Sequence, residues 1–153
     1  MTTTALTEVQ DLVININSEI RVEAPIDVTF DSLLEQLGAG NEKPDGTPMP
    51  MTIEPWPGGR WFRDLGGNNG HFWANVQAIN RPTLLEFSGP LFMSYPASNN
   101  VQYRLSQDGS ATIIKFHHSA LGLIHDDHRK NVATGWGYIH EQARKRAEQA
   151  RAK

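Results

Sequence analysis

Apolar and polar residues alternate along the chain from Leu12 to Ala24. One side of this segment is apolar except at Ser18, and the other side carries polar and charged residues. Such a period of two is typical of a long β-strand with one side facing water. The apolar side consists of Leu12, Ile14, Ile16, Ile20 and Val22.

The pattern becomes helical at Pro25. Apolar residues then recur at spacings of three and four as far as Leu37, and Gly38 is a natural helix end. Proline suits the first helical turn, because its missing N–H would have no partner there. We therefore predict a helix over about Pro25 to Leu37. The Gly- and Pro-rich stretch from Gly38 to Pro50 is predicted to be a loop long enough to cover part of the molecule.

From Met51 onward, short strand-like segments are separated by turns that contain glycine, which predicts an antiparallel meander. The segment from Gly89 to Asn100 is predicted to be a loop, and Gln107 to Ser110 a tight hairpin turn. The predicted strands are Met51 to Trp56, Arg60 to Leu65, His71 to Ile79, Thr83 to Ser88, Val101 to Ser106 and Ala111 to His118.

After Leu123 the chain is predicted to be helical to its end, with one continuous apolar stripe. Two glycines, Gly135 and Gly137, flank Trp136 within this helix, and each costs about 1 kcal/mol relative to alanine. We expect a close approach of the sheet to offset that cost, with Trp136 buried. The stripe consists of Val132, Trp136, Ile139, Ala143, Ala147 and Ala150.

These elements predict the α+β class. A curved antiparallel sheet of six to seven strands should wrap around the long C-terminal helix, which is a helix-grip arrangement. Residues 1–153 are expected to form a single domain, and residues 1–11 to be flexible.

A sheet curled around one helix leaves a cavity unless large side chains fill it. The small stripe residues Ala143, Ala147 and Ala150 favour a cavity there, with Gly38 to Pro50 near its mouth.

Composition removes several classes of function. The chain has 39% hydrophobic and 20% charged residues, a globular balance, and its net charge of −3 argues against nucleic acid as a partner. With no cysteine, disulfides, thiolate metal sites and cysteine nucleophiles are excluded. Residues 1–10 do not resemble a signal peptide, and no apolar run is long enough to insert into a membrane. The cytoplasm is therefore the expected location.

Several motifs occur in order along the chain: Glu23-Ala24-Pro25-Ile26-Asp27, Pro57-Gly58-Gly59-Arg60-Trp61, Asn75 to Ile79, Arg81-Pro82, Leu85-Glu86-Phe87, Gly109 with Thr112, Ile114, Phe116 and His118, and Gly135-Trp136. Together they resemble the START-like, birch-pollen-allergen-like superfamily, also called SRPBCC. Within it, the chain is most similar to the heat-shock-protein ATPase activator-like branch, and the resemblance covers about residues 12–145. It implies the helix-grip fold but no single function, because this superfamily includes lipid carriers, cyclases and aromatases. The family often has a tryptophan where this chain has Gly38 to Pro50, so a different pocket lid is expected.

Bulky side chains on the predicted strands and the last helix should face one another across the cavity. One interpretation is a pocket for a ligand, and the other is ordinary core packing, which aromatic residues dominate in any domain. His118 is expected to point inward as a polar hook or general base. The proposed ligand-binding residues are Trp61, Trp73, Tyr103, Phe116, His118 and Trp136.

The most polar cluster is His125-Asp126-Asp127-His128. Two histidines three residues apart on a helix share a face and could bind a metal with a third ligand from His117 or His118. The alternative is a helix start, with Asp126 or Asp127 as the cap. We favour the helix start, and predict no metal and no cofactor.

Three functions are consistent with these patterns. The first is the binding of a hydrophobic or amphipathic small molecule, without catalysis and without assigned catalytic residues. The second is an enzyme of the cyclase, aromatase or hydrolase type acting in the same cavity. The third is a chaperone-associated interaction module, which would require a contiguous exposed apolar patch. The sequence favours the first and leaves a homodimer open.

Overall fold

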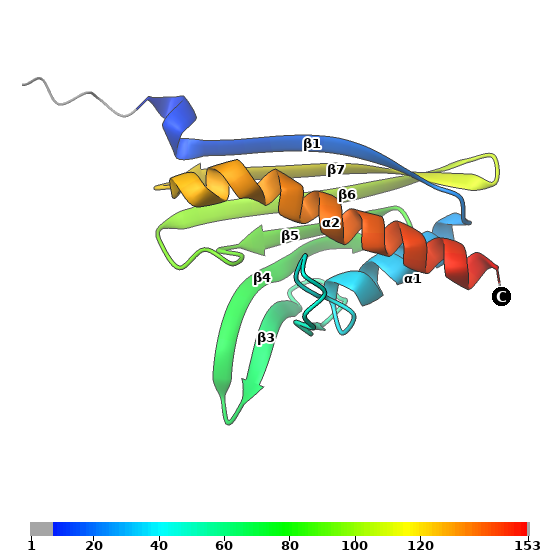
Figure 1. Cartoon of the computed structure of the whole chain (residues 1–153), viewed down its shortest axis with the longest axis horizontal. Coiled ribbons are helices and arrows are strands. Elements are labelled where there is room, and N and C mark those ends of the chain that lie inside the picture. The colour runs from blue at the N-terminus through cyan, green and yellow to red at the C-terminus, as the bar shows by residue number, and fades with distance from the viewer. Residues whose placement is uncertain (1–7, 153) are drawn as a thin grey trace, which may run out of the picture.

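The computed structural model describes residues 8–152 and contains a seven-stranded antiparallel sheet, two α-helices and a short 3-10 turn (Figure 1). Along the sheet the strand order is β1-β7-β6-β5-β4-β3-β2, so the first strand lies beside the last. The helix-grip α+β fold is thus confirmed. The elements are η1 (Val9–Leu12), β1 (Val13–Val22), α1 (Ile26–Leu37), β2 (Thr52–Ile53), β3 (Arg60–Gly66), β4 (Asn69–Asn80), β5 (Leu84–Gly89), β6 (Ala97–Asp108), β7 (Ala111–Gly122) and α2 (Asp126–Arg151).

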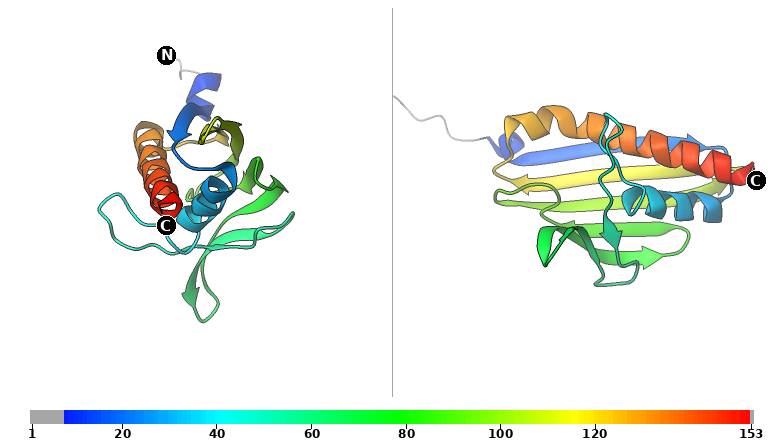
Figure 2. Two further views of the ribbon diagram at one scale, coloured as in Figure 1. Left: turned by 90° about the vertical axis from the view of Figure 1, so that its right-hand side faces the viewer. Right: turned by 60° about the horizontal axis from the view of Figure 1, so that its bottom comes forward.

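Both α-helices lie on the same, concave side of the sheet, as two further views show (Figure 2). The long helix α2 crosses the sheet, and α1 packs beside its C-terminal half. The side chain of Gln36 on α1 accepts hydrogen bonds from the Arg146 guanidinium on α2. Ala143 and Ala147 are buried, and their small side chains let the helices approach closely.

Strands β6 and β7 are each longer than predicted. Residues 97–100, predicted to be part of a loop, pair with residues 119–122 at the far end of β7. The surrounding Pro and Asn residues are typical of a turn. These residues nevertheless form a strand, because the end of β7 provides backbone groups with which they can pair, and strand formation depends strongly on such context.

The two glycines of α2 do not make the predicted close approach to the sheet. A Cβ atom built on Gly135 or Gly137 would meet no heavy atom within 4 Å. Trp136 is nevertheless buried, with 4% of its surface exposed, as predicted. The side chain and not the backbone therefore makes the contact with the sheet.

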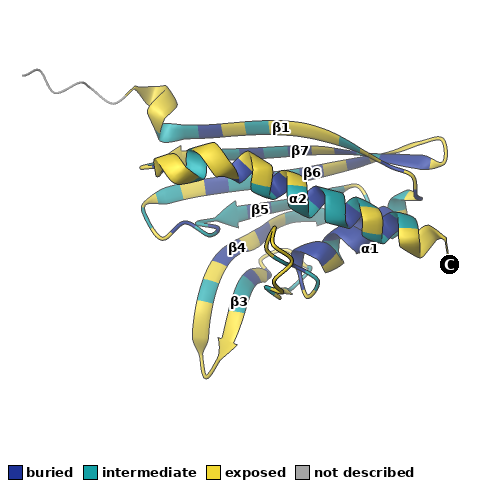
Figure 3. Cartoon of the chain, in the orientation of Figure 1, coloured by how far each residue is buried: buried dark blue, intermediate teal, exposed yellow. Residues whose placement is uncertain are grey.

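The apolar stripe of α2 also differs in composition from the prediction. Val132, Trp136, Ala143 and Ala147 are buried, but Ile139 is only partly buried and Ala150 is exposed. His140 takes a place in the core that the sequence analysis did not assign. The burial pattern shows the stripe facing the sheet and α1, with the opposite side of α2 exposed (Figure 3).

The N-terminal segment of the described chain packs against the start of α2. The expected flexibility of residues 1–11 falls partly on residues 1–7, which lie outside the described residues. Val9–Leu12 forms a 3-10 turn, and Arg129 of α2 donates to the carbonyl oxygens of Gln10, Asp11 and Val13. Within residues 8–152, neither helix has the length and apolarity needed to span a membrane.

Replacing Trp136 should show how much its burial contributes to stability. We expect Trp136→Ala to lower the free energy of unfolding by roughly 3–5 kcal/mol, the usual range for removing a large buried aromatic side chain. Urea denaturation followed by circular dichroism measures this change. Trp56→Ala is the matched control, because Trp56 is 55% exposed and its removal should change stability by less than about 0.5 kcal/mol. Equal effects of the two substitutions would contradict the packing described here.

Candidate functional site

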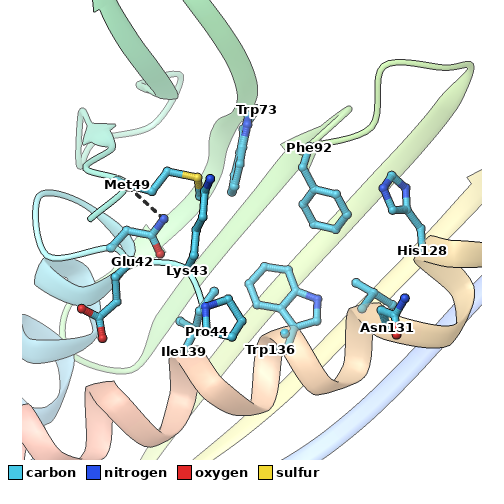
Figure 4. A pocket seen from close by; sticks show the side chains of 13 residues that line it. Glu42, Lys43, Pro44, Met49, Trp73, Phe92, His128, Asn131, Trp136 and Ile139 are labelled. Carbon is cyan, nitrogen blue, oxygen red and sulfur yellow. Dashed lines mark hydrogen bonds between the residues drawn. The ribbon is translucent and has the colours of Figure 1, made fainter. Parts of the chain in front are cut away.

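A pocket of about 230 Å³ lies between the N-terminal half of α2 and the strands and loops that face it (Figure 4). Trp136, Val132 and Ile139 form the wall on α2, Trp73 on β4 faces them, and Phe92 of the β5–β6 loop stands beside Trp73. The walls are thus mostly apolar. The remaining lining residues are Asn41, Glu42, Lys43, Pro44, Met49, His128, Asn131 and Gly135.

Aromatic contacts and side-chain hydrogen bonds hold the apolar walls in place. The rings of Trp73 and Phe92 pack edge to face with centroids 5.7 Å apart. The indole N–H of Trp73 donates to Nδ1 of His71 over 3.1 Å. The indole N–H of Trp136 donates to Nδ1 of His118 over 3.0 Å. Both tryptophans therefore have their polar atoms satisfied and can present ring carbon to the pocket.

The predicted loop from Gly38 to Pro50 supplies the side of the pocket opposite Phe92 and His128. Within it, the Asn41 side-chain amide donates to the Met49 carbonyl over 3.0 Å, which closes the loop on itself. Tyr138 of α2 donates its hydroxyl to the Glu42 carboxylate over 2.7 Å and attaches the loop to the helix. The loop is thus held over the pocket by both internal and long-range hydrogen bonds.

Among the proposed ligand-binding residues, Trp73 and Trp136 line this pocket. Trp61 packs behind Trp73 with ring centroids 5.1 Å apart, and its indole N–H donates to the Leu37 carbonyl. Phe116 and Tyr103 lie deeper in the core, their centroids 5.0 Å apart. His118, Tyr103, Trp61 and Phe116 each have 2% of their surface or less exposed. The structure therefore places these four residues behind the pocket walls.

The cavity was expected beside the alanines of α2 but lies nearer to the start of this helix. The helix α1 packs over Ala143 and Ala147 and fills the space beside them, because these small side chains let it approach α2 closely. Near Trp136, no side chain projects from Gly135, which lines the pocket with open space in front of its Cα. Gly135 was expected to let the sheet approach the helix backbone. It instead helps to leave the pocket open.

His118 is a fully engaged core histidine. It accepts from Trp136 at Nδ1, and its Nε2 lies 2.7 Å from Oδ1 of Asn99. Since Nδ1 accepts, the ring hydrogen is assigned to Nε2, which donates to Asn99. The Asn99 amide donates in turn to the carbonyl oxygens of Gly89 and Pro90. Both ring nitrogens are therefore occupied by protein groups, and neither is available as a hook or base.

His140 is a buried residue of α2 that the sequence pattern did not assign to the core. Its Nε2 lies 2.9 Å from the hydroxyl of Tyr103, and its ring stacks on Trp136 with an interplanar angle of 13°. The spacing of four from Trp136 and three to Ala143 could have placed it on the buried stripe.

Burial lowers the pKa of His140 to about 4. Burial and, secondarily, the neighbouring His117 lower the pKa of His118 to about 4 as well.

The polar cluster at residues 125–128 forms the start of α2. His125 is the residue before the helix, where Asp126 or Asp127 was predicted, and both aspartates lie in the first turn. Their negative charge there complements the helix dipole. Among residues 8–152, no three His, Cys, Asp or Glu side chains are arranged to hold a metal ion.

No protein-family model and no curated protein matches the sequence, but many solved structures share its fold. CalU16 from Micromonospora echinospora superposes with a TM-score of 0.60 at 17% identity, over 87% of this chain and 65% of CalU16. Ara h 8.0201 gives 0.65 at 13% identity over 88% and 97% of the two chains. StfQ, a di-domain ARO/CYC protein from the steffimycin biosynthetic pathway, gives 0.66 at 11% identity over 95% and 54%.

These similarities confirm the helix-grip fold that the sequence motifs implied. At identities of 11–17% they establish the fold alone. They do not single out the heat-shock-protein ATPase activator-like branch.

The two buried histidines should make the protein less stable in mild acid. Their folded-state pKa of about 4 lies below the ordinary value of 6.5, so between these values the unfolded state binds more protons. The free energy of unfolding should therefore fall as the pH drops from 6.5 to 4, by up to about 3 kcal/mol for each histidine.

Urea midpoints measured across this pH range test the expectation. His118→Gln should flatten the slope with pH, and His125→Gln, at an exposed position, should leave it unchanged. Glu54 contributes at lower pH, since the hydrogen bonds from Arg60 lower the pKa of its carboxyl group to about 2. A slope that is the same in all three proteins would rule out His118 as a cause.

Proposed function

We propose that this protein binds a small apolar or amphipathic molecule in the pocket between α2, Trp73, Phe92 and the loop at residues 41–49. The observation that carries the proposal is the pocket itself, about 230 Å³ and walled mainly by apolar and aromatic side chains. Ligand sites typically combine such walls with a few polar groups that orient the ligand. Here the polar groups include His128, Asn131 and Lys43 at the pocket boundary.

The volume of the pocket limits the size of the ligand. An engineered cavity of about 150 Å³ in another protein accommodates benzene, whereas sites for drug-sized molecules usually start at about 300 Å³. A pocket of about 230 Å³ lies between these sizes. It therefore suits one or two fused rings or a short acyl chain, and is too small for a molecule with four fused rings unless the loop moves.

The alternative of a cyclase, aromatase or hydrolase rests on the likeness to StfQ, which concerns the fold. The histidine predicted as a general base, His118, is buried behind the wall with both nitrogens engaged. A chaperone-associated role would need an apolar docking surface, and binding to a heat-shock ATPase would be its direct test. Binding without assigned catalysis is the function that the pocket supports best.

Indane, a two-ring hydrocarbon, is a suitable probe of the pocket. We expect it to bind with a dissociation constant in the micromolar range, about −8 kcal/mol. Titration followed by two-dimensional NMR of the tryptophan indole N–H groups locates the site. The signals of Trp73 and Trp136 should shift strongly, and the signal of the exposed Trp56 should not. Unchanged spectra and an unchanged melting temperature would argue against the proposal, as would shifts confined to Trp56.

Filling the pocket from the helix should abolish binding without harming the fold. We expect Gly135→Leu to prevent indane binding, because the new side chain projects into the open space of the pocket. Gly137→Leu is the matched control, since Gly137 lies on the same helix and is exposed. Both substitutions replace a helical glycine and should stabilise the protein by up to about 1 kcal/mol.

Calorimetry gives the affinities, and thermal unfolding gives the stabilities. Loss of binding in both variants, or in neither, would contradict this placement of the ligand. Native mass spectrometry of the protein as purified would then show whether a molecule of the expected size accompanies it.

A further inference from the structure

Phe92 and the start of α2 form one end of the pocket. At this end, a tyrosine and a histidine form a hydrogen-bonded pair. The hydroxyl of Tyr95 lies 2.6 Å from Nδ1 of His128, which lines the pocket. The ring of Tyr95 stacks on His125 with centroids 3.8 Å apart and an interplanar angle of 24°. Phe92 contacts the His128 ring edge to face, with centroids 5.2 Å apart. Figure 4 shows the imidazole of His128 beside Phe92 at this end of the pocket.

The loop that carries Phe92 and Tyr95 is held in a defined conformation. Leu91 has a φ of +55°, in the left-handed region that leucine rarely adopts, yet its side chain is fully buried. Its N–H donates to the Trp73 carbonyl over 2.7 Å. Asn99 binds the carbonyl oxygens of Gly89 and Pro90 just before it. Strained residues persist where the surroundings determine them strongly, often next to a functional site.

The hydrogen bond to Tyr95 determines what His128 can offer to a ligand. The phenol is a stronger acid than a neutral imidazole, so the shared hydrogen is assigned to Tyr95, and Nδ1 accepts it. In the neutral ring the other nitrogen, Nε2, then carries the hydrogen. No hydrogen bond among residues 8–152 involves Nε2 of His128, so this donor is free to bind a ligand.

We propose that His128 recognises a carbonyl or hydroxyl oxygen on the ligand, with Tyr95 positioning its imidazole. The ligand class is thus a one- or two-ring molecule with a neutral oxygen at one end, its rings lying against Trp73, Phe92 and Trp136. This inference rests on the proposed binding function and specifies the chemistry of its ligand. The tryptophans of the pocket have their own N–H groups engaged, so they do not compete with His128 for this oxygen.

The test compares indane with 1-indanone, which differs from it by one carbonyl oxygen. Calorimetry gives the ratio of the two dissociation constants for each protein variant. His128→Phe should reduce the relative preference for 1-indanone about threefold to tenfold, the equivalent of one hydrogen bond. His125→Phe is the matched control: it keeps an aromatic ring under Tyr95 and should leave the ratio unchanged.

The outcomes separate this inference from the proposed function. If indane does not bind the parent protein, the binding function itself is wrong. Suppose instead that indane binds the parent and His128→Phe equally well. If the ratio of the dissociation constants of indane and 1-indanone is then also the same in both proteins, the proposed recognition by His128 is wrong. Should His128→Phe fail to bind indane, His128→Leu supplies the comparison, because leucine has no hydrogen-bond donor in its side chain. An unchanged ratio there also overturns the inference.

Tyr95→Phe tests the positioning role separately. It keeps the stacking on His125 and removes the hydroxyl, so the two tautomers of His128 should become mixed. The ¹⁵N chemical shifts of the imidazole report this directly, with Nδ1 of the acceptor type and Nε2 of the N–H type in the parent. An identical pair of shifts in both proteins would show that Tyr95 does not orient His128.

Discussion

The hydrogen bond between Trp136 and His118 joins the long helix to the sheet, and the pocket depends on it. The indole N–H of Trp136 donates to His118, which donates to Asn99, which binds the backbone at the start of the β5–β6 loop. One chain of contacts thus links the helix wall, the sheet and the loop that carries Phe92. Because buried polar groups must be paired, each member of the chain determines the orientation of the next.

The two halves of α2 have different neighbours and therefore different roles. Around Ala143 and Ala147 the helix is closed off by α1, with Gln36 and Arg146 hydrogen-bonded across the contact. Around Gly135 the helix faces the open space of the pocket. The fold can therefore keep its helix attached at one end while the other end remains available to a ligand.

The sequence was a good guide to the elements and a poorer guide to the site. Alternation in β1 and the helical spacing after Pro25 identify those elements, because each depends on local pattern alone. Of the six proposed ligand-binding residues, Trp73 and Trp136 line the pocket, whereas His118 is satisfied within the core. Periodicity indicates that a side chain points inward, but not whether it meets another side chain or a cavity. Phe92 and Tyr95 belong to an irregular loop, where no periodicity was available to indicate their role.

The two glycines beside Trp136 also have a consequence for motion. Neither is packed by the sheet or by a neighbouring loop, so the cost of glycine in a helix is not offset there. Local opening of a protein begins where few contacts protect the backbone hydrogen bonds. In this turn of α2 the protection comes from the buried side chain of Trp136 and not from its two glycine neighbours, and the turn is also a wall of the cavity. Brief opening of the same turn would give a molecule a way in and out while the rest of the fold stays intact.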